Sequence, residues 1–117
     1  MLIGQLAGRT ETSERLLRYY ERVGLLTSRR QANGYRDYDE DAEHTVRQIR
    51  ALLAAGLSTN LIKQVLPCAR ADGSLRPCPG VLDRLRDQLA LLDRRAADLA
   101  QARQTLRRAI TATETAE

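Results

Sequence analysis

Residues 13–24 read Ser13-Glu14-Arg15-Leu16-Leu17-Arg18-Tyr19-Tyr20-Glu21-Arg22-Val23-Gly24, and this stretch decides the fold. Apolar residues recur at steps of three and four and predict one buried helix face: Leu16, Leu17, Tyr20 and Val23. Basic and aromatic residues recur on the other side and predict one exposed stripe: Arg15, Arg18, Tyr19 and Arg22. Ser13 is expected to cap this helix and Gly24 to end it.

Arginines on one helix face suit a polyanion that also presents base edges. A solvated helix face, with ordinary charge pairs to Glu14 and Glu21, is the alternative that this stretch leaves open. The preceding residues favour DNA. Residues 3–8 predict a short helix and residues 9–12 a polar turn, so the outline is that of a helix-turn-helix.

A small basic hairpin is predicted next. Asn33-Gly34 is the strongest short hairpin signal, and a type I′ turn with positive φ at both residues is expected there. Basic residues flank the turn, with Arg29 and Arg30 before it and Arg36 after it, and Tyr35 stands next to Arg36. The hairpin is expected to act as a wing against phosphates, and an exposed hairpin without a ligand is the alternative.

Two further helices follow. Asp39 is expected to cap the first, whose inward residues are Ala42, Val46, Ile49 and Leu53. Gly56 ends that helix, Ser58 caps the second, and Pro67 stops it. The core face of the second helix is Leu61, Ile62, Val65 and Leu66. Lys63 and the free amides after Ser58 are available to phosphate.

The last part of the chain predicts a dimerisation helix over residues 81–110. Its heptad positions are Leu82, Leu85, Leu89, Leu92, Ala96, Leu99, Arg103 and Leu106, with Ile110 just after. Such a stripe left in water would be a large exposed apolar patch, so a coiled-coil homodimer is expected. A helix folded back on its own domain is the alternative. Residues 111–117 are expected to be a frayed tail.

The sequence thus predicts a mainly α protein with a winged helix-turn-helix DNA-binding domain over residues 1–66. A hinge loop with two cysteines covers residues 67–80, before the dimerisation helix. The net charge of +4 favours an anionic partner. No apolar run is long enough for a membrane span and no signal peptide is recognised, so a cytoplasmic protein is expected. No catalytic set of residues is present, so an enzyme is not expected.

Four segments together resemble the MerR family of bacterial transcription regulators: residues 3–7, 17–26 and 33–39, and the segment from Ile49-Arg50 to Gly56-Leu57-Ser58. The resemblance covers residues 2–66 in the right order and spacing. It implies a second helix in the major groove, wings on flanking phosphates, and an antiparallel coiled-coil homodimer. It also implies palindromic promoter elements with an overlong spacer, distortion of that DNA, and engagement of RNA polymerase.

Carried over by position, Arg18 and Tyr19 match the family's recognition-helix contacts, and Tyr35 and Arg36 match its wing contacts. Arg15 falls at a sequence-reading position. The family usually has glycine where Glu11 stands and a small polar residue where Leu16 stands. Asn60 and Leu61 occupy positions where an acidic residue often completes a capping box. These departures leave the operator sequence open.

Cys68 and Cys78 flank the hinge and are tentative effector or redox residues. Cys78 lies close to where metal-responsive relatives place a sensing cysteine. Three interpretations stay open: a two-coordinate thiolate site for a soft ion, a reversible Cys68–Cys78 disulfide, and ordinary free thiols, which a cytosolic chain favours. Two thiolates fall short of the four ligands usual for zinc, so metal and cofactor stay unassigned.

The leading hypothesis is a sequence-specific, homodimeric DNA-binding transcription regulator that distorts double-stranded promoter DNA and responds to a thiol-reactive signal or soft metal. The expected DNA-binding residues are Ser13, Arg15, Arg18, Tyr19, Arg22, Tyr35, Arg36 and Lys63. The first alternative is an architectural or excisionase-like protein that bends DNA without an effector. The second is a coiled-coil adaptor whose basic domain binds an acidic protein.

Overall fold

The computed structural model describes residues 1–68 and 78–116, with the side chain of Cys68 left aside. The chain separates into two compact units, Met1–Cys78, here called the N-terminal unit, and Pro79–Glu117. The predicted hinge, residues 67–80, straddles this division. Its centre, residues 69–77, lies outside the described part.

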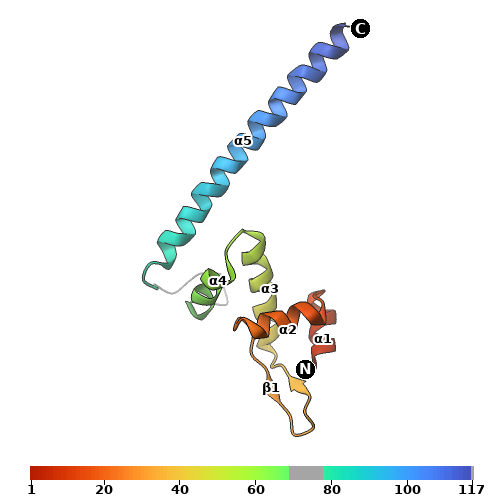
Figure 1. Ribbon diagram of the computed structural model, residues 1–117, viewed down its shortest axis with the longest axis vertical. Coiled ribbons are helices and arrows are strands. Elements are labelled where there is room, and N and C mark those ends of the chain that lie inside the picture. The colour runs from red at the N-terminus through yellow and green to blue at the C-terminus, as the bar shows by residue number, and fades with distance from the viewer. Residues whose placement is uncertain (69–77, 117) are drawn as a thin grey trace. The chain divides into compact units, whose positions relative to one another are not determined.

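The N-terminal unit is a winged helix-turn-helix. Its elements in chain order are α1 (Ile3–Thr10), α2 (Glu14–Arg22), β1 (Arg29–Arg30), β2 (Arg36–Asp37), α3 (Asp41–Ala54), α4 (Thr59–Val65) and the 3-10 turn η1 (Leu66–Cys68). α1 packs against both α2 and α3, α3 also packs against α4, and the hairpin extends from this group of helices (Figure 1).

The core of this unit contains aliphatic residues and tyrosine, because the sequence has no Phe or Trp. The largest fully buried side chains are Tyr20, Tyr38, Leu6, Leu17, Ile49, Ile62, Val46 and Val65. They come from α1 to α4 and from the residue just after β2, so one core joins the helix-turn-helix to the base of the hairpin. Backbone pairing adds to this joint, since the Tyr38 amide donates to the Met1 carbonyl at 2.7 Å.

Helix boundaries follow the predicted caps, with one correction. The Ser13 and Ser58 hydroxyls accept from the amides of Leu16 and Leu61, each at 3.1 Å. Gly24 and Gly56 follow α2 and α3 with positive φ, which glycine adopts without strain. The prediction of Asp39 as the cap of α3 is wrong. Glu40 stands at that position without a side-chain cap, and Asp39 contributes only its backbone carbonyl, which accepts from the Ala42 amide.

The hairpin forms as predicted, but its turn is different. β1 and β2 are antiparallel, with Arg29 opposite Asp37 and Arg30 opposite Arg36. The Gln31 amide donates to the Tyr35 carbonyl at 2.9 Å, and the Gly34 amide donates to the Gln31 carbonyl at 2.9 Å. Gly34 has φ 85° and Asn33 has no positive φ. The connection is therefore a three-residue loop with glycine in the left-handed position, not a two-residue type I′ turn.

The second unit is built on one helix, α5 (Val81–Ala116). Its 36 residues make it about 54 Å long. The helix continues past residue 110, where the sequence placed the start of a frayed tail. Large apolar side chains stay exposed along its length: Leu82, Leu89, Leu99, Leu106 and Ile110. Among the described helices, none is both long and apolar enough to cross a membrane.

Candidate DNA-binding surface

α2 presents the predicted basic stripe. Leu17 and Tyr20 are buried on its inner side, while Arg15, Arg18, Tyr19 and Arg22 are exposed. The Arg22 guanidinium carbon lies 6.0 Å from the centroid of the Tyr19 ring, within the range of a cation–π contact. This contact restrains two long side chains of the stripe on the outer surface of the helix.

A groove runs along the outer side of α2, from its N-cap to its last residue. It is lined by Ser13, Arg15, Leu16, Tyr19 and Arg22. Four of these five residues were predicted to bind DNA, so the structure brings them into one surface. Leu16 was instead predicted to pack inward with Leu17. It is half-buried, and its side chain helps to line the outer groove.

The hairpin is joined to α2 by an ion pair. Arg36 Nε lies 3.3 Å from Glu21 Oε2, and both side chains are partly withdrawn from solvent. Arg36 therefore connects the wing to α2 in the free protein, whereas the sequence placed it only against phosphate. Tyr35, the neighbouring wing residue, is 64% exposed. The Tyr35 amide donates to the Asn33 side chain, which orders the loop beside it.

Tyr38 lies under this junction. Among the described residues, its buried hydroxyl and Oε1 of Glu21 have no hydrogen-bond partner. Burial raises the pKa of Tyr38 well above its ordinary value, and the Glu21 carboxylate acts in the same direction. The charges of Arg36 and Arg18 act in the opposite direction. The Arg36 guanidinium belongs to the ion pair with Glu21 just described, so this pair and the buried Tyr38 form one junction between the hairpin and α2.

Lys63 reaches the end of α2 from α4. A Cβ atom added to Gly24 would lie 2.9 Å from Lys63 Nζ, so the ammonium covers this glycine closely. A cation at the C-terminal end of a helix is favourable because the last carbonyls carry partial negative charge. Lys63 thus borders the same helix as the arginine stripe, although it is distant from that stripe in sequence.

Sequence reasoning missed the role of Arg50. The Nη1 atom of this α3 residue donates to the Thr10 carbonyl at 3.0 Å, the Glu11 carbonyl at 3.1 Å and the Thr12 hydroxyl at 3.1 Å. It therefore fixes the turn between α1 and α2 and satisfies carbonyls that the end of α1 leaves open. Arg47, one turn earlier, donates to the Arg9 carbonyl at 3.2 Å.

The cysteine region is described only in part. Cys78 is disulfide-bonded, whereas the composition favoured free thiols; its partner sulfur lies outside the described residues. Within residues 1–68 and 78–116, no three His, Cys, Asp or Glu side chains are grouped so that they could hold a metal ion.

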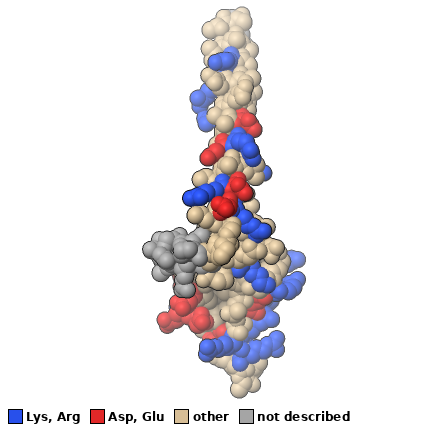
Figure 2. All heavy atoms as spheres, turned by 90° about the vertical axis from the view of Figure 1, so that its left-hand side faces the viewer, with Lys and Arg blue, Asp and Glu red and all other residues tan. Residues whose placement is uncertain are grey.

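Charge distribution agrees with this geometry. Figure 2 shows basic side chains gathered around the hairpin end of the N-terminal unit, whereas basic and acidic side chains are mixed along α5. A helix-turn-helix with arginines on its second helix, beside a basic hairpin, defines a DNA-binding protein of the winged helix-turn-helix class.

Comparison with known proteins gives the family. Residues 1–68 match the model of the MerR HTH family regulatory proteins, and residues 43–109 match the MerR DNA-binding model. The transcriptional regulator HmrR of Rhizobium leguminosarum bv. viciae is 32% identical over 106 residues, which cover 91% of this chain and 81% of HmrR. Nodulation protein NolA of Bradyrhizobium sp. (strain NC92) is 37% identical over 106 residues, which cover 90% of this chain but only 41% of NolA. The chain belongs to the MerR family of DNA-binding transcription regulators.

Solved structures share the fold. HiNmlR, a MerR family regulator lacking the sensor domain and bound to promoter DNA, has a TM-score of 0.68 at 21% identity, covering 94% of this chain and 86% of that chain. The lead(II) complex of PbrR691 from Ralstonia metallidurans CH34 has a TM-score of 0.66 at 26% identity, covering 91% of this chain and 81% of that chain.

Proposed function

We propose that the chain regulates transcription as a homodimer on double-stranded promoter DNA. In each copy α2 enters the major groove, and the hairpin and Lys63 lie against the flanking phosphates. The observation that carries this proposal is the exposed Arg15, Arg18 and Arg22 stripe on the second helix of a helix-turn-helix. The Arg36–Glu21 ion pair supports it, because it fixes the wing to the same helix.

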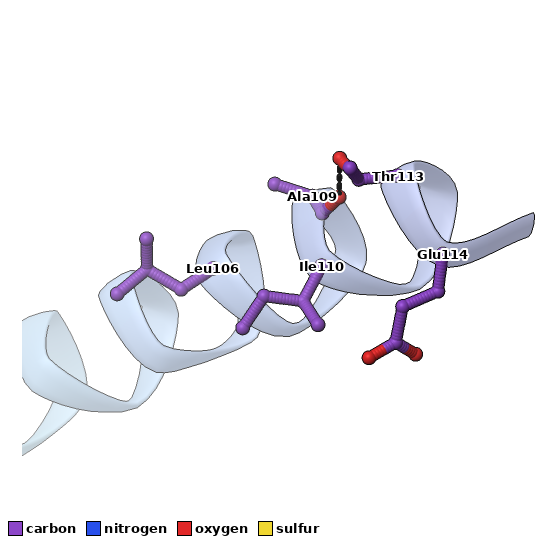
Figure 3. A pocket seen from close by; sticks show the side chains of 5 residues that line it. All are labelled: Leu106, Ala109, Ile110, Thr113 and Glu114. Atoms are coloured by element: carbon purple, nitrogen blue, oxygen red, sulfur yellow. Dashed lines mark hydrogen bonds between the residues drawn. The ribbon is translucent and has the colours of Figure 1, made fainter. Parts of the chain in front are cut away.

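The apolar stripe of α5 supports the homodimer. Near its end, a groove is lined by Leu106, Ala109, Ile110, Thr113 and Glu114, with the leucine and isoleucine side chains projecting from the helix (Figure 3). A second copy of α5 would cover such residues along residues 81–110. A two-fold dimer presents two copies of α2 and therefore fits a palindromic promoter element. Distortion of that DNA and engagement of RNA polymerase are part of the same proposal, and membership of the MerR family supports them.

We propose that the effector of this regulator is a thiol-reactive signal or a soft metal. This proposal is supported by the position of Cys78 beside α5 and by the lead(II) complex of PbrR691. Because Cys78 is disulfide-bonded, its sulfur becomes available to an ion only after reduction. Native mass spectrometry before and after a dithiol reductant, with and without added soft metal, measures this. An unchanged mass under all conditions, with no bound ion, would exclude both forms of the response.

Substitution of Arg18 tests the DNA-binding function. Arg18→Ala is expected to lower operator affinity by at least about 30-fold in a gel shift, because each half-site loses a contact worth about 1–3 kcal/mol. Dimerisation is expected to persist. Arg94→Ala removes the same charge from an exposed position of α5 and serves as the matched control. Normal operator affinity of the Arg18→Ala protein would sink the assignment.

Two further assays, transcription from the bound promoter and DNA competition, separate the alternative functions. An architectural protein would bind the promoter without changing transcription from it, whereas a regulator changes the transcript level. A coiled-coil adaptor whose basic domain binds an acidic protein would remain bound to that protein when promoter DNA is added in excess.

A further inference from the structure

Leu16 occupies an unusual place on the proposed recognition helix. It is the third residue of α2, and its amide is held by the Ser13 hydroxyl at 3.1 Å. The next residue, Leu17, is fully buried, so the core takes one leucine of the pair and leaves the other half-buried on the groove side. The first turns of a recognition helix are the ones that meet base edges.

The surroundings of Leu16 combine apolar and cationic groups. Leu16 and the Tyr19 ring lie three residues apart on one helix face and line the groove together with Arg15 and Arg22. The arginines suit phosphates and guanine edges. A leucine gains nothing from either group. The apolar group that the major groove of DNA presents is the C5-methyl group of thymine.

We propose that Leu16, together with the Tyr19 ring, receives the C5-methyl group of a thymine in each operator half-site and so selects thymine over cytosine there. The inference rests on the proposed function, because it requires α2 in the major groove. The resemblance to the MerR family implies a small polar residue at position 16. Leu16 would therefore give this chain a base preference that a small polar residue at this position would not provide.

The expected effect follows from the transfer of one methyl group out of water. Loss of one buried methyl group weakens binding about fourfold, so loss in both half-sites weakens it by roughly tenfold or more. Arg15 and Arg22 are not altered by this change. The effect should therefore be the same at low and high salt, unlike the loss of a phosphate contact.

The experiment begins with selection of an operator from random duplexes by the full-length protein. Each thymine of the selected half-site is then replaced by deoxyuridine, which lacks only the methyl group, and affinity is measured by fluorescence anisotropy. One position is expected to show the fourfold loss. Cytosine at that position should bind weakly, and 5-methylcytosine should recover part of the loss.

Protein variants assign the methyl group to Leu16. Leu16→Ala is expected to bind the thymine and deoxyuridine duplexes equally, whereas Leu16→Met, which keeps an apolar side chain of similar size, should still distinguish them. Leu61→Ala is the matched control: Leu61 is also half-buried and stands third in a helix capped by serine. This control should retain the deoxyuridine effect. Circular dichroism establishes that each variant is folded.

The possible failures are distinct. If no duplex is selected, the proposed DNA-binding function is wrong. If an operator is selected but no thymine methyl affects affinity, the function stands and the inference about Leu16 is overturned. Persistence of the deoxyuridine effect in Leu16→Ala would overturn it equally, because another residue would then contact the methyl group.

Discussion

Glu11 occupies a backbone conformation that residues with a side chain rarely adopt. It has φ 51° and ψ 39°, in the left-handed region, immediately after α1. The Thr12 amide donates to the Ala7 carbonyl at 3.1 Å, and this bond closes the helix end in a motif whose left-handed residue is usually glycine. This conformation fits the glycine that the family resemblance implies at this position. It also places the unusual acid in an exposed turn rather than on α2.

Glu11→Gly is therefore expected to stabilise the protein by about 0.5–1 kcal/mol, because relief of the left-handed strain exceeds the added freedom of the unfolded chain. Urea unfolding at a fixed protein concentration measures this. Glu11→Gln is the matched control, since it removes the charge and keeps Cβ. Equal stabilisation by both substitutions would show that the acid, and not the backbone conformation, is unfavourable.

At the level of elements, α3 holds the turn of the helix-turn-helix through Arg50. Arg50→Met removes three hydrogen bonds to Thr10, Glu11 and Thr12. We expect a loss of about 1–2 kcal/mol in stability, because charged hydrogen bonds to partly buried groups are lost. Operator affinity should also fall, since α2 is then less firmly oriented against α1. Urea unfolding and anisotropy with a labelled operator measure the two effects.

Arg47→Met is the matched control for this prediction. It removes the same charge from α3, but Arg47 makes one hydrogen bond to the Arg9 carbonyl and an exposed pair with Glu43, so smaller losses are expected. The salt dependence of binding separates positioning from direct contact. A lower salt dependence with unchanged stability in Arg50→Met would show that Arg50 binds phosphate and does not hold the turn.

The contrast between α2 and Arg50 shows which features of the fold can be predicted from the sequence and which cannot. The faces of α2 and the serine caps were predictable, because helical periodicity and capping are local. The contacts of Arg50 join residues 38 to 40 positions apart, and no local pattern encodes them. The Arg36–Glu21 pair was missed for the same reason. Within the hairpin, Asn33-Gly34 predicted the position of the turn, but Gly34 alone takes positive φ.

At the scale of the whole molecule, α5 carries large apolar side chains that stay exposed in the described part of the chain. Leu99 is 65% exposed and Leu106 is 64% exposed, although both stand on the predicted heptad stripe. Exposed leucines at this spacing are stable in water only when another helix covers them. The proposed dimer would therefore satisfy a requirement of α5 itself, and it would bring a second DNA-binding unit to the same promoter.

Leu99→Glu is expected to convert the dimer into single chains at the same protein concentration, because each copy would place a charge in the apolar interface. Size-exclusion chromatography with light scattering measures the mass. Affinity for a full palindrome should fall far more than affinity for one half-site, since the second α2 is no longer tethered to the first. Gln101→Glu adds the same charge two residues away, off the heptad stripe, and should leave mass and affinity unchanged. A Leu99→Glu protein that remains a dimer, with normal affinity for the palindrome, would show that residues 81–110 do not form the interface.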